Sequence, residues 1–298
     1  MANFNQIGLD LQSVIKRTYA NLLYRSSFYN FLNEAYIGDI RQTGTPVIEV
    51  MKQKKTTLNT RSYAEMTSAV TPALAQYDSV KVDLTQLRLD YSFRIPVVVV
   101  GSNIANAIDE ALKLNDSEIE VKIDTFGYDK LADTITGDRT ASKTAADTGS
   151  TYTWAPANQQ GYIDALNALK ATLFNLKVYD TYRLGLEATE YGKLVAALTS
   201  ILKFETLAGV EGVDRGEVAK AYGIDIFPIN SSVLTNSEKG YFASPVGTVG
   251  DVFFSAMNEF AGSYPGFPGY YVVEGNVLFG AEVVRPEAIV KLVAGASV

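Results

Sequence analysis

The sequence contains no cysteine and no histidine. Without cysteine there can be no disulfide framework and no thiolate nucleophile, and without both residues there can be no Cys/His zinc or haem site. A Ser-His-Asp triad and an imidazole general base near neutral pH are excluded as well. A hydrolase would have to use carboxylates, lysine, tyrosine or oxygen-bound Ca²⁺ or Mg²⁺. We therefore expect no enzymatic activity, no catalytic residues, no cofactor and no metal site.

Long apolar runs are also missing. The longest is Ile95–Val100, whereas a membrane helix needs about 20 apolar residues. The first ten residues lack the basic and apolar segments of a secretion signal. The 26 basic and 33 acidic residues give a net charge of −7, which argues against a dedicated nucleic-acid binder. We expect no membrane association and synthesis in the cytoplasm.

Apolar residues make up 47% of the 298 residues and charged residues 20%, a composition typical of a globular chain with one large or two modest domains. Helix and strand patterns alternate without βαβ regularity, so we predict an α+β fold. The clearest helix pattern lies at residues 158–177, with further helices predicted at 102–115 and 189–202. Strands are predicted at 181–186, at 223–227 with Pro228 at a sheet edge or strand end, and near the C-terminus. The aperiodic residues 136–153 indicate a loop.

The N-terminal region has helical spacing from about Leu9 to Tyr36. This pattern predicts two helices, or one bent helix, ending at Gly38, which can adopt a left-handed C-cap conformation. The helices belong either to an ordinary core or to an arm that packs on a neighbouring subunit. Such a pattern more often belongs to an ordinary core, whereas the terminal position and the many aromatic residues suggest the arm.

Residues 44–95 form a long β excursion. Apolar residues alternate on even numbers over Val80–Leu84 and on odd numbers over Leu87–Ile95. Side chains of a strand alternate faces, so the phase change at Thr85-Gln86 requires a β-bulge or a break. We expect the Leu87–Ile95 row to face the subunit's own core and the Val80–Leu84 row to face a neighbour.

Three passages in the C-terminal third carry a resemblance to a known family. They are Tyr182–Leu186 with the helix Glu190–Ile201 that follows it, then Gly216–Ser231, and finally Phe279–Leu292. In this order they resemble the major capsid proteins of tailed bacteriophages, which have the Hong Kong 97-type fold. The N-terminal part is similar to that family only in the order of its elements.

The resemblance implies a division of the chain into an arm, a loop and two domains. Residues 1–43 would be an N-terminal arm, 44–95 an extended β loop, 96–180 and 270–298 a peripheral domain, and 181–269 an axial domain. The candidate intersubunit contacts are a lysine tract at the loop tip, the even apolar row and two aromatic residues of the arm: Lys52, Lys54, Lys55, Val80, Val82, Leu84, Tyr19 and Phe28.

The same resemblance implies a structural function. Copies of the chain would assemble through hexamers and pentamers into an icosahedral shell, built in the host bacterial cytoplasm, that encloses phage double-stranded DNA. Expected partners are a separate scaffolding protein, a portal protein, decoration proteins and DNA bound by weak non-specific contacts. Two alternatives remain open, an encapsulin-like nanocompartment shell and a carboxylate-dependent hydrolase.

Overall fold

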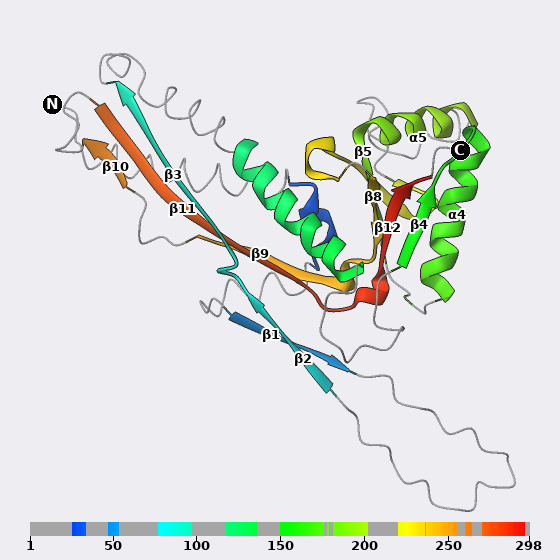
Figure 1. Cartoon of the computed structure of the whole chain (residues 1–298), viewed down its shortest axis with the longest axis horizontal. Coiled ribbons are helices and arrows are strands. Elements are labelled where there is room, and N and C mark those ends of the chain that lie inside the picture. The colour runs from blue at the N-terminus through cyan, green and yellow to red at the C-terminus, as the bar shows by residue number, and fades with distance from the viewer. Residues whose placement is uncertain are drawn as a thin grey trace, which may run out of the picture.

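The computed structural model describes eleven stretches of the chain, to which every structural statement below refers. They are residues 26–33, 47–53, 77–96, 117–135, 150–175, 178, 181–201, 220–235, 237–254, 260–263 and 270–295. These stretches form a body built on a mixed sheet, a long antiparallel sheet that extends from it, and a two-stranded ribbon (Figure 1). None of the described helices is long and apolar enough to span a membrane.

The body contains a six-stranded sheet with two parallel and three antiparallel pairings. In spatial order its strands are β4 (Ser150–Trp154), β12 (Ile289–Ala294), β8 (Glu238–Ala243), β5 (Tyr182–Glu187), β7 (Ile224–Ile229) and β6 (Lys220–Ala221). β4 pairs parallel with β12, and β5 pairs parallel with β7. Because β6 pairs only with the start of β7, Pro228 lies on the sheet edge, as predicted.

Two helices cover one face of this sheet, α4 (Gln159–Asn175) and α5 (Ala188–Ile201). Both helices and the strand β5 confirm the sequence-based predictions. Alternation along β8 sends Phe242 toward α4 and α5, while Tyr241 faces the opposite side of the sheet. The apolar stripe of α4 is buried against the sheet and consists of Tyr162, Leu166, Leu169 and Leu173.

A long antiparallel sheet is centred on β11 (Tyr270–Val283). One side of β11 pairs with β3 (Leu87–Pro96). The other side pairs with β9 (Thr248–Phe254) and β10 (Phe260–Ser263). Short 3-10 turns link or flank these elements at Phe28–Phe31 (η1), Ser231–Val233 (η5), Pro245–Gly247 (η6) and Pro286–Ala288 (η7).

Residues 117–135 form a helix that the sequence analysis did not predict, shown in blue-green across β9 and β11 (Figure 1). Its residues Ile119, Ile123 and Leu131 are buried in a second core that includes Val277 and Phe279 of β11. The helix covers the face of the six-stranded sheet opposite α4 and α5. The helix predicted at 102–115 lies outside the described residues.

The β excursion has the predicted break. β1 (Val47–Gln53) and β2 (Tyr77–Asp83) form an antiparallel ribbon, and β3 begins at Leu87 after a three-residue interruption. The chain changes partner there, since β2 pairs with β1 whereas β3 pairs with β11. The ribbon projects away from the body below the long sheet (Figure 1).

Some expectations from the sequence are wrong. The chain is already extended at Leu32, with φ −77° and ψ 148°, so no helix continues through it toward Tyr36. Residues 150–153, expected in a loop, belong to β4 because they pair with β12. The sheets also cross the domain boundaries expected after residues 180 and 269, because β4 and β12 join the six-stranded sheet while β9 and β10 join the long sheet.

Candidate assembly surfaces

The base of the ribbon is anchored in the subunit. Val50 and Val82 project from the ribbon face that packs against Val249 of β9 and Val284, and Leu84 joins them from the turn. All five side chains are buried, and Val80 packs partly against them. This third small core fixes one face of the ribbon to the end of the long sheet.

The opposite face of the ribbon carries exposed apolar side chains. Met51 is 69% exposed, Tyr77 59% and Val47 47%. The register pairs Met51 with Ser79 and Glu49 with Lys81, so these side chains share one face. We call this the outer ribbon face and define it as Val47, Glu49, Met51, Tyr77, Ser79 and Lys81.

An exposed apolar cluster with opposite charges beside it is a typical protein contact surface. Glu49 and Lys81 lie directly opposite each other on the two strands, which is a favourable cross-strand arrangement. The outer ribbon face therefore presents apolar side chains around a charged pair, on an element that projects from the body. It can bury apolar area against a partner without unfolding any part of the subunit.

Several candidate contact residues from the sequence lie elsewhere. Val82 and Leu84 are fully buried in this chain, and Phe28 is buried in the second core, so contact with a neighbour is the wrong prediction for all three. Val80 is partly buried, and Lys52 lies on β1 opposite Asp78. Three further candidates lie outside the described residues: Tyr19, Lys54 and Lys55.

The reason for the error is the parity of the strand. Alternation defines two rows of side chains, and the purely apolar even row was expected to face a neighbour. The structure buries Val82 and Leu84 of that row and exposes the odd row, which contains Tyr77, Ser79 and Lys81. An apolar residue within a charged row is the sequence signal that could have indicated this contact surface.

A tight turn sets the direction of the ribbon. The Asp83 carboxylate accepts hydrogen bonds from the Thr85 backbone N–H at 2.8 Å and from the Thr85 hydroxyl at 2.7 Å. Both bonds favour the charged carboxylate and lower the pKa of Asp83. Gly280 of β11 lies against this turn, where it has no side chain to collide with the Asp83 carbonyl oxygen.

The polar face of β3 is exposed. Arg88, Asp90, Ser92 and Arg94 all face solvent, and the Arg88 Nε atom lies 2.9 Å from an Asp90 oxygen. On the other face, Leu87 and Leu89 pack against the second core. The rest of the odd row, Tyr91, Phe93 and Ile95, lies outside the described side chains.

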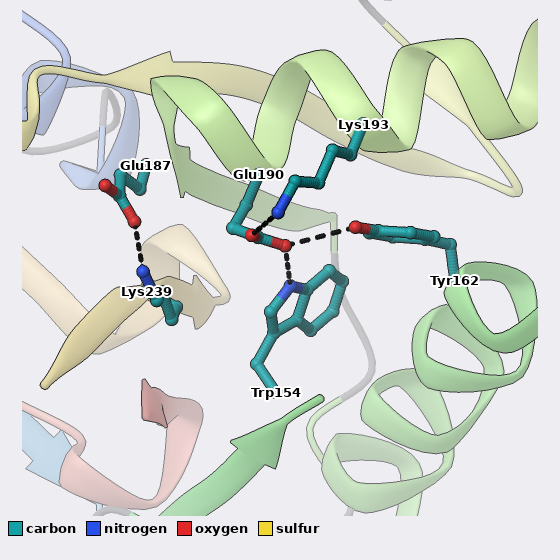
Figure 2. Close-up of polar contacts among 6 residues, drawn as sticks. All are labelled: Trp154, Tyr162, Glu187, Glu190, Lys193 and Lys239. Atoms are coloured by element: carbon teal, nitrogen blue, oxygen red, sulfur yellow. Dashed lines mark hydrogen bonds and ion pairs between the residues drawn. The ribbon is translucent and has the colours of Figure 1, made fainter. Parts of the chain in front are cut away.

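Glu190 is a buried carboxylate of the body with several partners, shown in Figure 2. Glu190 of α5 accepts hydrogen bonds from Trp154 Nε1 of β4 at 3.1 Å and from the Tyr162 hydroxyl of α4 at 3.2 Å. Its second oxygen lies 2.7 Å from Lys193 Nζ. These contacts tie a strand and two helices together.

The electrostatics of this cluster indicate a structural role. Burial opposes ionisation of Glu190, but the hydrogen bonds from Lys193, Trp154 and Tyr162 outweigh it and lower the pKa of the carboxyl. Burial and the adjacent Glu190 charge raise the pKa of Tyr162 to about 12. Nearby, Glu187 and Lys239 form a separate ion pair at 2.6 Å (Figure 2). Both oxygens of Glu190 are therefore occupied, and the carboxyl is not poised to donate a proton near neutral pH.

The hydrolase alternative finds no further support in the described part of the chain. Carboxylate catalysis needs two acidic groups in one cleft whose pKa values are pushed apart. Glu190 is instead an ionised carboxylate surrounded by donors. Among the described residues, no group of three or more acidic side chains could hold a metal ion.

Comparison with known proteins gives no match from sequence alone. No protein-family model matches the chain, and no curated protein matches it either. Solved structures do match. A structure from Mycobacterium phage Che8 is similar with a TM-score of 0.60 and 15% identity, over 90% of this chain and 91% of that one.

Two further structures have the same likeness. The capsid of cyanophage P-SCSP1u matches with a TM-score of 0.59 and 13% identity, over 85% of each chain. The mature capsid of bacteriophage PhiM1 matches with a TM-score of 0.55 and 10% identity, over 86% of this chain and 84% of that one. The likeness extends over nearly the whole of each chain despite the low identity, and so the chain has the fold of a phage major capsid protein.

Proposed function

We propose that the protein is a major capsid protein, whose copies assemble through hexamers and pentamers into an icosahedral shell around phage double-stranded DNA. The observation that carries this proposal is the outer ribbon face. One face of a projecting ribbon is packed into its own subunit, whereas the other exposes Met51 and Tyr77. Such a surface becomes buried when a neighbouring copy covers it. The capsid fold supports the same conclusion.

The parts of the chain take roles that the Hong Kong 97-type arrangement suggests. In this proposal, residues 1–43 act as an arm and 44–95 as the loop that reaches a neighbour. The six-stranded sheet forms contacts around the capsomer axis, and the long sheet with the 117–135 helix forms the periphery. The subunit itself is not catalytic.

The direct test is a charge placed on the outer ribbon face. Met51→Glu should prevent particle formation while leaving the melting temperature of the subunit near that of the wild type, because Met51 is mostly exposed. The matched control is Ala171→Glu, which adds the same charge at an exposed position of α4. Particles are measured by negative-stain microscopy and light scattering, with a candidate scaffolding protein co-expressed.

Two outcomes would contradict the proposal. Met51→Glu particles in wild-type yield would show that the outer ribbon face is not an assembly contact. A wild-type protein that stays a compact monomer under every assembly condition would contradict the shell itself. If particles form, their contents distinguish a virion from an encapsulin-like compartment, because nuclease-protected DNA supports the first and a cargo protein supports the second.

Contact with DNA should be weak and independent of sequence. A net charge of −7 leaves few cations to neutralise phosphates, so attraction has to come from local basic patches. Residues 1–62 hold eight basic and four acidic residues. The double change Lys16→Glu and Arg17→Glu should alter DNA retention only slightly, and a sequence-specific footprint from the subunit would contradict this view. Scaffolding, portal and decoration proteins complete the proposed set of partners.

A further inference from the structure

Residues 26–33 lie against the 117–135 helix through a carboxylate that binds their backbone and hydroxyls. Asp124 accepts hydrogen bonds from the Ser26 hydroxyl at 2.5 Å, from the Ser27 hydroxyl at 2.7 Å and from the Phe28 backbone N–H at 3.0 Å. The Ser27 backbone N–H is a fourth donor at 3.2 Å. Asp124 is only 4% exposed, so these donors replace water around a buried carboxylate.

An aromatic socket holds the same segment. The Phe28 ring packs edge-to-face on Tyr128, with centroids 5.7 Å apart, and on Phe279 at 6.2 Å. Gly127 makes room for it, because a Cβ at that position would lie 2.5 Å from the Phe28 Cδ2 atom. The Phe31 ring packs on Phe227 of β7 at 5.1 Å. The glycine in the middle of the helix is therefore part of a recess shaped for Phe28.

Further contacts reach the two sheets. The Arg183 guanidinium of β5 donates to the Asn30 carbonyl oxygen, and the Thr248 hydroxyl of β9 donates to the Phe31 carbonyl oxygen. The Asn33 backbone N–H donates to the Thr248 carbonyl oxygen at 3.1 Å. Within the described residues, the segment forms one 3-10 turn and joins no strand ladder. It could leave without breaking the hydrogen-bonded ladder of either sheet.

We propose that residues 26–33 are a latch, a separable segment that binds a preformed socket on the 117–135 helix and both sheets. The socket recognises two serines followed by Phe28 and Phe31, through a carboxylate clamp and two aromatic recesses. The latch lies within one chain and does not depend on the proposed shell function.

The coupling to the helix follows from Asp124. When the segment leaves, four hydrogen-bond donors leave the carboxylate together. A buried charge without partners is strongly unfavourable, so water has to take the place of the segment, and the face of the helix around Asp124 loses its cover. Release of the segment and exposure of the helix are thus one event, while α4 and α5 on the far side of the six-stranded sheet stay protected.

Hydrogen exchange of the full chain tests the coupling. Asp124→Asn places an amide NH₂ against backbone donors, and Ser27→Ala removes one hydroxyl that contacts both Asp124 and Tyr128. Both variants should raise the exchange rates of residues 26–33 and 117–135 together, by about tenfold or more for Asp124→Asn. Exchange in α4 should not change. The control is Asp164→Asn, the same substitution on the exposed face of α4.

Two results would overturn the latch in this experiment. Faster exchange in residues 26–33 alone, or no change in either variant, would show that the segment and the helix are not coupled. Faster exchange throughout the chain, α4 included, would show that residues 26–33 are an ordinary part of the core.

A peptide added in trans tests separability. Phe28→Ala vacates the aromatic recess, and a peptide of residues 24–34 with blocked termini should then restore slow exchange in the 117–135 helix. A peptide with the two phenylalanines replaced by alanine should not restore it. If Phe28→Ala does not fold, Asp124→Asn is tested with the same pair of peptides. The wild-type peptide should then slow exchange in the 117–135 helix through its aromatic contacts alone. Failure of the wild-type peptide in a folded variant would overturn the preformed socket.

Discussion

Gly280 of β11 packs against Leu84 so closely that a Cβ on the glycine would lie 2.5 Å from the Leu84 Cα atom. The Asp83 carbonyl oxygen is nearer still to that position. Since both obstacles are backbone atoms, neither can rotate away as a side chain would. The turn between β2 and β3 can therefore rest on β11 only where β11 has a glycine.

Gly280→Ala should accordingly destabilise the subunit by about 1–3 kcal/mol, because the backbone of the turn has to move. The measurement is the free energy of unfolding from urea denaturation. Gly192→Ala is the matched control, since the residue lies within α5 and, apart from its chain neighbours and the backbone of its own helix, no atom lies within 4 Å of the added Cβ. The free energy of unfolding of the control should rise by about 0.5–1 kcal/mol, because alanine has the higher helix propensity. Equal effects of the two substitutions would contradict the close contact.

Leu84 and Met51 allow a test of which ribbon face points inward. Leu84→Ala should cost about 2–5 kcal/mol of unfolding free energy, since Leu84 is fully buried beside Val249 and Val284. Met51→Ala should change it by about 0.5 kcal/mol or less, because the side chain is mostly exposed. The same urea denaturation series measures both. The reverse order would mean that the even row faces outward after all.

Glu190 should make the free energy of unfolding fall at acidic pH. Its pKa is lowered in the folded state, so its contribution is present above the unfolded pKa, near the ordinary value of 4.5, and is lost as the pH falls through the folded value. Glu190→Gln should cost about 1–2 kcal/mol near neutral pH, with a difference from wild type that shrinks as the pH falls toward about 3. The exposed Glu118→Gln serves as the control. A difference that stays constant with pH would exclude a role for the charge.

Tyr162 should make the free energy of unfolding fall at alkaline pH. Its pKa is raised to about 12 from the ordinary 10.0, so the unfolded chain loses this proton first and stability falls as the pH rises above about 10. Tyr162→Phe should flatten part of that fall, measured by urea denaturation at about pH 8 and about pH 11. Tyr128 and Tyr241 remain in the variant with pKa values that burial also raises. An unchanged slope would show that Tyr162 ionises equally in both states.

Local patterns predicted the elements whose signal lies within a few turns of chain. The spacing of Tyr162, Leu166, Leu169 and Leu173 identified α4 because one helix face supplies its own periodicity. The phase change at Thr85-Gln86 identified the break because side-chain alternation is a local property of a strand. Neither inference needed to know what the element packs against.

Features set by distant parts of the chain could not be predicted. The helix at 117–135 has a glycine at its centre, which lowers helix propensity, and the reason for Gly127 is the ring of Phe28. From the sequence, Asp124 looks like an ordinary surface acid of the helix. Its partners Ser26 and Ser27 lie nearly a hundred residues earlier in the chain, so no local pattern indicates that it is buried. The inward row of the ribbon likewise depends on Val249 and Val284.

The change of partner between β2 and β3 has a mechanical consequence. β3 runs antiparallel to β11 through ten paired positions, from Leu87 opposite Phe279 to Pro96 opposite Tyr270. A tension applied to the ribbon enters β3 at Leu87 and, where it acts along the strand axis, loads this ladder in shear. Hydrogen bonds perpendicular to the strands then share the load, whereas peeling would break them one at a time. A subunit pulled by its ribbon along that axis would resist as a whole sheet.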